Sequence, residues 1–196
     1  MPAALESQSL DQLFRGARST HAFKPDPVDD ETLHALYDLL KWGPTAFNAQ
    51  PARYVFIRSP EAKGRLAPAL SAGNRDKTLA APVTVIIAYD PRFFERLPTQ
   101  YPARDTRPLF LNDASLALST AVRNGTLQGA YLLIAARALG LAAGPMSGFD
   151  AEKVDREFFA DTGYRANFLA NLGHDDGSVA HPRGPRLEFA EVARII

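Results

Sequence analysis

Apolar residues recur at helical spacing near the start of the chain. Leu10, Leu13 and Phe14 lie three or four positions apart and follow Ser9. Serine is a frequent N-cap, and this spacing places the apolar side chains on one face of a helix. The pattern predicts a short amphipathic helix capped by Ser9 and ending near residues 16–18.

A second helical pattern fills residues 28–43. The predicted buried stripe consists of Leu33, Leu36, Tyr37 and Leu40. Asp29 can cap this helix, with Val28 and Leu33 in contact as a hydrophobic staple. Gly43 is the expected C-terminal glycine, and Pro44 prevents the helix from continuing.

Strands are predicted where β-branched and aromatic residues cluster in runs of suitable length. These runs are residues 53–59, 83–89 and 167–173. Helical patterns follow at residues 60–70 and 151–160, the second with Asp150 as its N-cap. Residues 141–150 are small and turn-forming and predict a loop. The tail after residue 181 begins irregular and basic and ends in a predicted helix.

The longest apolar segment runs from Ala114 to Leu139. Its second half is apolar on nearly every side, which predicts a helix buried all round. A helix of roughly 25 residues is about 38 Å long, and a second subunit would help to bury it. The segment therefore indicates a homodimer. Its weak point is Asn124-Gly125, where the helix could kink or split.

The order of these elements bears on fold class and domain organisation. Strands alternate with helices, but the connections are uneven and the strands are few, which predicts an α+β or α/β three-layer domain. A chain of 196 residues fits one domain. No repeat, low-complexity tract or linker marks an internal boundary, so a single domain is expected over residues 1–196.

Composition and charge narrow the choice of partners and compartment. The 22 basic and 22 acidic residues balance, which disfavours nucleic acid and anionic membranes as partners. There is no cysteine, so disulfides, Cys-zinc sites and thiol nucleophiles are excluded and a reducing compartment fits. Neither a leader pattern nor about 18 continuous apolar residues occurs. We expect a cytoplasmic protein without a membrane partner.

Several common catalytic signatures do not occur in the sequence. Neither the G-x-G-x-x-G nor the P-loop pattern is present, and in GPMSG the position of Ser147 does not fit a nucleophile elbow. The histidines lack H-E-x-x-H spacing, and His174-Asp175-Asp176 is more simply a solvated turn than a metal site. No metal is expected.

Four stretches of basic, hydroxyl and amide residues fall in loops predicted at the ends of elements. They are Arg18 to His21, Thr45 to Gln50, Asn74 to Lys77 and Arg183 to Arg186. Each stretch alone is more simply a solvated loop. A ligand with a phosphate and a hydrogen-bonding ring would use all four, because guanidinium groups and hydroxyls bind phosphate while amides bind ring edges.

Five motifs occur in a fixed order along the chain. They are RSTHAF (18–23), GPTAFNAQP (43–51), GNRDKTLAAP (73–82), GLAAGPMSGFD (140–150) and PRGPRL (182–187). Together they resemble the FMN-dependent nitroreductase family, and in particular its RutE/HadB-like branch of malonic semialdehyde reductases. The resemblance covers nearly the whole chain from residue 10 onward. It implies a nitroreductase-like fold with a mixed central sheet flanked by helices, in an intertwined homodimer with one FMN in each of two interface pockets.

The resemblance assigns residues to the phosphate, ribityl chain and ring of the flavin. On the phosphate and ribityl side the implied residues are Arg18, Ser19, Thr20, His21, Arg183 and Arg186. Asn74 and Lys77 are implied at the pyrimidine edge. His21 stands where the family usually has a second basic residue, so its contact stays open, as does the choice between Arg183 and Arg186.

The resemblance also gives a reason for the two proline stops around residues 43–51. In the family the matching loop comes from the other subunit, lies beside the flavin ring, and is pinned at both ends. The implied contacts are Pro44, Thr45, Ala46 and Asn48. The alternative for Asn48 is a structural role in which its amide satisfies the neighbouring backbone.

The GPMSG loop is implied to lie at N5 of the flavin. The implied contacts are Pro145, Met146, Ser147 and Gly148. The backbone N–H groups of Ser147 and Gly148 are the expected donors to N5, where a hydrogen bond tunes the flavin. Many relatives have Glu where Ser147 stands, so no catalytic side chain is expected.

The implied reaction is ping-pong hydride transfer from NAD(P)H through FMN to a small acceptor. The branch suggests a 3-oxo acid such as malonic semialdehyde, whose carboxylate would need a cation; the candidates are His21, Arg53, Arg104 and Arg123. Nitroaromatics, quinones or enones are the alternative acceptors. A non-catalytic flavin-binding protein or a structural protein without a cofactor is a further alternative, and the choice between NADH and NADPH stays open.

Overall fold

The computed structural model describes residues 3–178 and 181–196. Its strands are β1 (Ala52–Ile57), β2 (Val83–Tyr89), β3 (Ala142–Met146) and β4 (Arg165–Gly173). Its α-helices are α1 (Ser7–Leu10), α2 (Asp30–Leu40), α3 (Pro60–Leu66), α4 (Ala72–Ala80), α5 (Leu97–Gln100), α6 (Arg107–Leu111), α7 (Ala114–Ala138), α8 (Ala151–Phe158) and α9 (Phe189–Val192). Short 3₁₀ or π turns cover Asp11–Arg15, Ala46–Asn48, Ala67–Ala69 and Phe93–Arg96.

The four strands form one sheet in the order β1-β2-β4-β3, and each neighbouring pair is antiparallel. The segment before Thr20 adds a parallel bridge, in which Ser19 lies beside Ala143 of β3. The central pairing of β2 with β4 joins residues that lie far apart in the chain, so the sheet connects the N-terminal and C-terminal halves of the chain.

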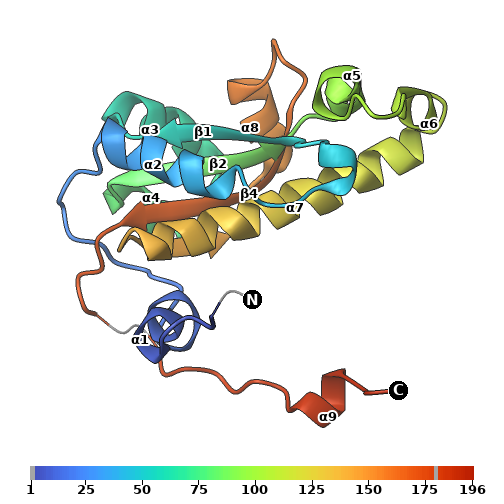
Figure 1. The fold of residues 1–196 in the computed structure, drawn as a ribbon. Coiled ribbons are helices and arrows are strands. Elements are labelled where there is room, and N and C mark those ends of the chain that lie inside the picture. The colour runs from blue at the N-terminus through green and yellow to red at the C-terminus, as the bar shows by residue number, and fades with distance from the viewer. Residues whose placement is uncertain (1–2, 179–180) are drawn as a thin grey trace.

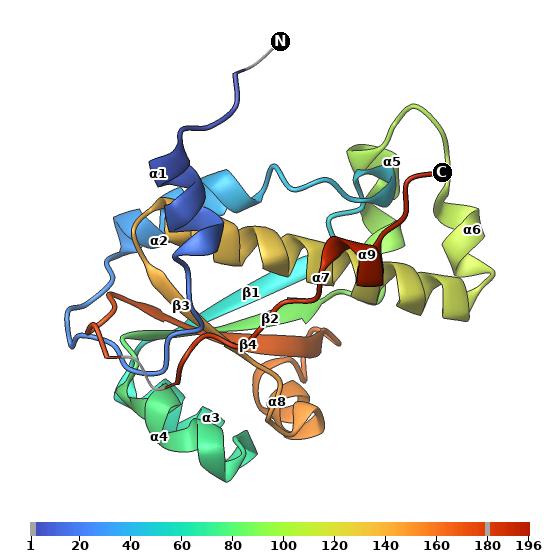
Figure 2. The ribbon, with the colours of Figure 1, turned by 90° about the horizontal axis from the view of Figure 1, so that it is seen from below.

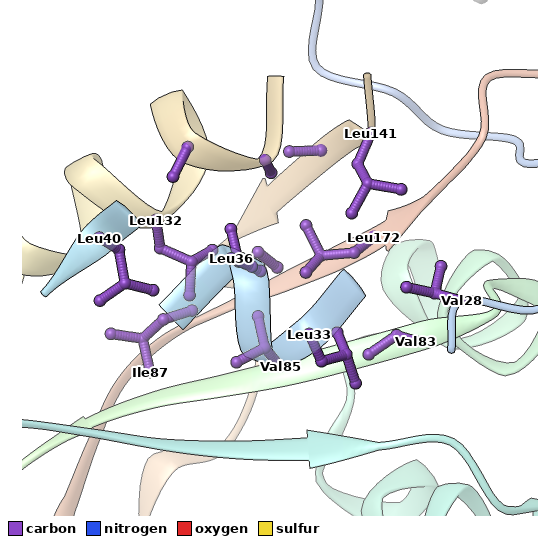
Figure 3. Packing of buried hydrophobic residues seen from close by; sticks show 14 residues of the cluster. Val28, Leu33, Leu36, Leu40, Val83, Val85, Ile87, Leu132, Leu141 and Leu172 are labelled. Atoms are coloured by element: carbon purple, nitrogen blue, oxygen red, sulfur yellow. The ribbon is translucent and has the colours of Figure 1, made fainter. Parts of the chain in front are cut away.

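Helices cover both faces of the sheet, which confirms the predicted three-layer arrangement. Figure 2 shows α2 and α7 on one side and α3, α4 and α8 on the other. Side chains alternate along β2, so Val83, Val85 and Ile87 face α2 and α7, whereas Ile86 and Ala88 face the opposite layer. Figure 3 shows the first of these two cores around Leu36 and Leu132.

The predicted second helix is confirmed as α2. Asp29 caps it, because its carboxylate accepts a hydrogen bond of 2.7 Å from the Thr32 N–H. Leu36 and Leu40 are fully buried against α7 and the sheet, and burying each stabilises the fold by about 1.5–3 kcal/mol. Tyr37 was wrongly placed in the buried stripe: it is 47 % exposed, and it lies about 100° around the helix from the fully buried Leu36.

The first helix differs from its prediction at its N-terminus. It begins at Ser7 rather than after Ser9, and its second half is a π turn over Asp11–Arg15. Arg15 bonds the carbonyl of Ser7 at 2.9 Å and the hydroxyl of Ser7 at 2.7 Å. Ser9 therefore lies inside the helix and does not cap it.

Two predicted loops are regular elements in the structure. Residues 142–146 form the edge strand β3, although the sequence there contains only small residues, proline and methionine. A Cβ on Gly144 would overlap the carbonyl oxygen of Thr20, so the small residues allow the segment before Thr20 to approach β3. Asn74 and Lys77, expected in a loop, lie in α4, whose apolar pattern is too weak to indicate a helix.

The long predicted helix is confirmed as α7, continuous from Ala114 to Ala138 without a break at Asn124-Gly125. The expectation that it is buried all round does not hold within one chain. One side packs on α2 and the sheet, but Leu118 is 50 % and Leu127 is 46 % exposed on the other. No helix in residues 3–178 and 181–196 is long and apolar enough to cross a membrane.

The C-terminal tail after residue 181 extends away from the sheet, as Figure 1 shows. Its apolar side chains are exposed, with Phe189 at 63 % and Ile195 at 90 %. The predicted tail helix is confirmed as the short helix α9. Within one chain, therefore, the apolar side chains of the tail have little core to pack against.

Candidate functional site

A cavity of about 420 Å³ lies between the N-terminal segment and the C-terminal tail. We call it the basic pocket. Six residues that were predicted to bind a phosphate and its ribityl chain line it: Arg18, Ser19, Thr20, His21, Arg183 and Arg186. Arg18 donates to the carbonyl of His181, and Arg183 donates to the carbonyl of Ala17 at 2.9 Å. The structure therefore brings together two segments from opposite ends of the chain.

Arg137 is a lining residue of the basic pocket that sequence reasoning missed. It comes from the last turn of α7, and its Nη1 donates to the carbonyl of Leu13 at 2.9 Å. Its Nε is buried without a partner among the described residues, and burial lowers the pKa of the guanidinium group. An unpaired buried donor is costly, and the residue also lines the pocket, where its guanidinium group is a candidate to bind an anion. In the sequence, the one feature that marks Arg137 is that it is a single cation within an apolar run.

Two histidines stand at the mouth of the basic pocket. The rings of His21 and His181 meet edge to face with centroids 6.1 Å apart. Partial burial, and then the positive charge of Lys77 and the proximity of His181, lower the pKa of His21 below its ordinary value. His21 is therefore more often neutral near pH 7 than a free histidine.

A second polar surface forms where α4 meets the loop after β3. Asn74 Nδ2 donates to the Gly148 carbonyl at 2.8 Å, and the Ser71 N–H donates to the same oxygen at 3.1 Å. A Cβ at Gly148 would lie 2.6 Å from Asn74 Nδ2, so glycine is needed for this contact. Lys77 lies one turn after Asn74 on the same half-buried face.

The backbone N–H groups of Ser147 and Gly148 have no acceptor within the described part of the chain. They follow β3, whose other end carries the backbone bond from the Thr20 N–H to the Ala143 carbonyl, 3.0 Å long. β3 thus leads from the basic pocket toward this pair of donors, and the strand covers roughly 10 Å between Ala143 and Met146. A ligand with an anion at one end and a hydrogen-bonding ring at the other fits this order.

The loop of residues 43–51 lies elsewhere in the same chain. It packs beside the middle of α7, whereas Arg137 reaches the basic pocket from the last turn of that helix. The 13 residues between Asn124 and Arg137 span about 20 Å of helix, and Figure 1 shows the loop beside the middle of α7, away from the last turn of that helix. Pro44, Thr45, Ala46 and Asn48 are therefore not brought together with the other predicted residues within one chain.

Polar groups of this loop bond to one another and to α5. Asn48 Nδ2 donates to the Gln100 carbonyl at 3.0 Å, and its Oδ1 accepts from Gln50 Nε2 at 3.0 Å. The Thr45 hydroxyl accepts from the Gln50 N–H at 3.1 Å. These bonds support the structural alternative for Asn48, whose contact with a flavin stays a prediction.

The loop backbone is strained. Phe47, Asn48 and Gln50 have φ angles of 54°, 50° and 42°, in the left-handed region that costs non-glycine residues roughly 1–2 kcal/mol each. Such strain persists where the surroundings determine the conformation, and it is concentrated at functional sites. The surroundings of the loop therefore determine its conformation.

Arg53 was one of four cations considered for a substrate carboxylate. Its guanidinium forms an ion pair with Asp90 at 2.7 Å, donates to the Gln50 carbonyl at 3.0 Å and lies over the Tyr164 ring. These contacts occupy the guanidinium group of Arg53. Arg104 and Arg123 are exposed. No group of three or more potential metal ligands occurs in residues 3–178 and 181–196.

The structure is thus an α+β protein with a basic pocket and a second polar surface at α4 and the loop after β3. A model of the nitroreductase family matches residues 14–174, and the chain belongs to this family. The match covers most of the chain and includes β3, α4 and the N-terminal residues that line the basic pocket.

Two relatives match the chain along its whole length. A protein of Stenotrophomonas maltophilia (strain R551-3) is 57 % identical over 195 residues, with 100 % of both chains covered. One of Burkholderia lata is 57 % identical over 191 residues, with 97 % of this chain and 98 % of the relative covered. Both carry the provisional name NADH dehydrogenase/NAD(P)H nitroreductase.

Solved structures confirm the fold. A provisionally named nitroreductase of Exiguobacterium sibiricum, solved in complex with FMN, superimposes with a TM-score of 0.84 at 18 % identity, covering 100 % of this chain and 99 % of the other. The enone reductase CLA-ER, from a gut-bacterial fatty acid saturation pathway, also gives 0.84, at 21 % identity, covering 98 % of this chain and 100 % of the other. The expected nitroreductase-like fold is thus confirmed.

Proposed function

We propose that the chain is an FMN-dependent NAD(P)H oxidoreductase, a single domain that works as a homodimer. The observation that carries the proposal is a basic pocket beside one end of β3, together with the N–H groups of Ser147 and Gly148 just after its other end, which are unpaired within the described residues. Bound FMN would supply two-electron hydride chemistry, which these side chains do not supply themselves.

The donor set of the basic pocket fits a phosphate. Guanidinium groups bind phosphate oxygens through paired, charge-assisted bonds, and Arg18, Arg183 and Arg186 all line this cavity. Arg137 adds a buried Nε that has no partner in the described residues. The hydroxyls of Ser19 and Thr20, which also line the cavity, would bind the chain that follows the phosphate.

The donor set at the other end fits the ring. Asn74 is fixed by its bond to the Gly148 carbonyl, and Lys77 places a cation on the same face of α4. The Ser147 and Gly148 N–H groups would donate to N5, and Lys77 would stabilise negative charge at the N1/O2 edge. None of these residues needs to act as an acid or a base.

The proposed site is complete only in a dimer. The loop of residues 43–51 lies too far from the basic pocket of its own chain, so it would cover the ring bound by a partner copy. Apolar surface is available to bury: Leu118 and Leu127 of α7 are exposed, and so is Trp42 at 77 %. Exposed apolar surface on this scale is typical of protein interfaces.

The proposed acceptor is a small 3-oxo acid such as malonic semialdehyde, as in the RutE/HadB-like branch. Its carboxylate would bind a cation near the open ring face, and Arg104 and Arg123 are exposed and have no ion-pair partner in the described residues. Nitroaromatic acceptors are the second candidate because the relatives are named NAD(P)H nitroreductases. Enones form the third class, which the enone reductase of the same fold supports.

The visible spectrum of the purified protein tests the proposal. A flavin spectrum that bleaches under anaerobic NAD(P)H, and returns when an acceptor is added, would support it. Comparing turnover with malonic semialdehyde, a nitroaromatic, a quinone and an enone would then rank the acceptors. A flavin that NADH and NADPH both fail to reduce would indicate a non-catalytic flavin-binding protein, and a protein that takes up no FMN would refute the cofactor assignment.

A further inference from the structure

Two amide side chains are buried on the same face of α7. Asn124 and Gln128 are each 4 % exposed, and they lie one helical turn apart on neighbouring positions of the helix surface. An apolar residue is the usual occupant of such a position. Buried amides are retained where their hydrogen bonds have a use.

Both amides bind the backbone of the loop at residues 43–51. Asn124 Oδ1 accepts from the Ala46 N–H at 2.8 Å, inside the loop, and Gln128 Oε1 accepts from the Ala52 N–H at 2.9 Å, just after it. Asn124 Nδ2 donates to the Thr120 carbonyl at 2.8 Å, which fixes the amide with its oxygen toward the loop. One rigid helix therefore holds the loop at two points.

The conformation between these two points is one that the loop would not adopt by itself. Phe47, Asn48 and Gln50 have positive φ angles. The Phe47 ring packs edge to face on Tyr101 and Phe110, with centroids 5.5 and 6.1 Å away. Asn48 bonds the last residue of α5, Gln100. The loop is thus held between α7 and the α5–α6 segment.

We propose that Asn124 and Gln128 are positioning residues: they hold loop 43–51 in the strained conformation in which it covers the flavin ring of the partner subunit. This inference rests on the proposed function. An apolar side chain at either position would fill the same space but would leave a loop N–H without an acceptor. The loop would then be free to leave its positive-φ conformation, and its contact with the ring would weaken.

The test compares variants that remove the acceptor with variants that keep it. Asn124→Leu and Gln128→Met remove the acceptor oxygen, whereas Asn124→Asp and Gln128→Glu keep one. Thr126→Val is the matched control, because the Thr126 hydroxyl is on the same helix but bonds Val122 and Asn167, away from the loop. If Asn124→Leu fails to fold, Gln128→Met carries the test alone.

Two measurements decide the outcome. Amide hydrogen exchange in the apo-protein is expected to accelerate roughly tenfold at Ala46 in Asn124→Leu and at Ala52 in Gln128→Met. The dissociation constant for FMN is expected to rise by about tenfold in the same variants, with recovery in Asn124→Asp and Gln128→Glu and no change in Thr126→Val.

The two possible failures can be told apart. Unchanged amide exchange would overturn the inference, and so would faster exchange with unchanged FMN affinity, because the amides would then serve only the fold. A wild-type protein that takes up no FMN would overturn the proposed function and this inference with it. Normal uptake by the wild type combined with normal affinity in both acceptor-removing variants overturns this inference alone.

Discussion

Gly148→Ala tests how closely α4 and the loop after β3 must approach each other. The new methyl group would lie 2.6 Å from Asn74 Nδ2 and 2.8 Å from Ser71 Oγ, where ordinary contact begins near 3.4 Å. Asn74 would have to move by nearly 1 Å and lose its 2.8 Å bond to the Gly148 carbonyl. The substitution therefore displaces the amide that is proposed to meet the pyrimidine edge of the flavin.

The expected cost has two parts. Losing the hydrogen bond costs about 1 kcal/mol, and the overpacking costs about 1–3 kcal/mol. The sum, roughly 2–4 kcal/mol, corresponds to a melting temperature lower by roughly 4–16 °C in a domain of this size. FMN affinity should fall as well, because Asn74 no longer lies where the ring needs it.

A double-mutant cycle with Asn74→Ala isolates the cause. Removing the Asn74 amide removes the nearest clash, so Gly148→Ala should cost at least about 1 kcal/mol less in that background. Thermal unfolding of the apo-proteins and FMN titration measure both effects. Gly64→Ala is the control: no atom lies within 4 Å of its Cβ position, and alanine should stabilise α3 by about 0.5–1 kcal/mol. An equal cost of Gly148→Ala in both backgrounds would refute the reasoning.

Three further substitutions test other parts of the site and the fold. Burial lowers the pKa of Lys63 to about 8 from 10.5. Between these two pH values Lys63 is protonated in the unfolded chain but neutral in the folded one, so the free energy of unfolding should rise with pH across that window, by up to about 3 kcal/mol. Denaturant unfolding of Lys63→Met should lack this rise. Arg137→Leu should weaken FMN binding roughly tenfold while riboflavin, which has no phosphate, binds as before; an equal loss for both ligands would remove Arg137 from the phosphate site. Lys77→Ala should bind FMN weakly and shift its reduction potential by an amount equivalent to roughly 1–3 kcal/mol, and an unaltered potential measured by dye equilibration would contradict its place at the ring edge.

Elements with a strong apolar period could be predicted from sequence. In α2 the period, the Asp29 cap and the Gly43-Pro44 stop all agree, and the helix has those limits within a few residues. The limits of α7 were also predicted closely, because its apolar pattern is long and its second half is almost wholly apolar. Local pattern and tertiary packing favour the same structure in these segments.

β3 and α4 could not be predicted for a physical reason. The small residues of β3 allow Thr20 to approach Gly144. This steric requirement comes from a segment that is distant in the sequence, so local strand propensity does not reveal the strand. In α4 the half-buried residues Asn74 and Lys77 are polar, so the half-buried face of this helix lacks the apolar period that predicts a helix. At both places the usual hydrophobic patterns are absent.

The candidate site was predicted in part. Family motifs led to Arg18, Arg183 and the loop around Ser147, and the structure places the two arginines in one pocket. Arg137 could not be found in this way, because its role depends on where the last turn of α7 lies. Nor could local patterns reveal that Asn124, which resembled a break in a helix, bonds the loop at Ala46.

The central claim, that each flavin site is built from two chains, can be tested with hybrid dimers. One chain carries Arg18→Ala and Arg183→Ala in the basic pocket; the other carries Ala46→Trp, which places bulk in the loop beside the ring. Neither parent homodimer should bind FMN tightly. Co-expressed with different tags and purified as a hybrid, the pair should bind one FMN with wild-type affinity, because one of its two sites has no altered residue. A hybrid that binds no FMN, or a chain that sediments as a monomer when loaded with FMN, would contradict the account.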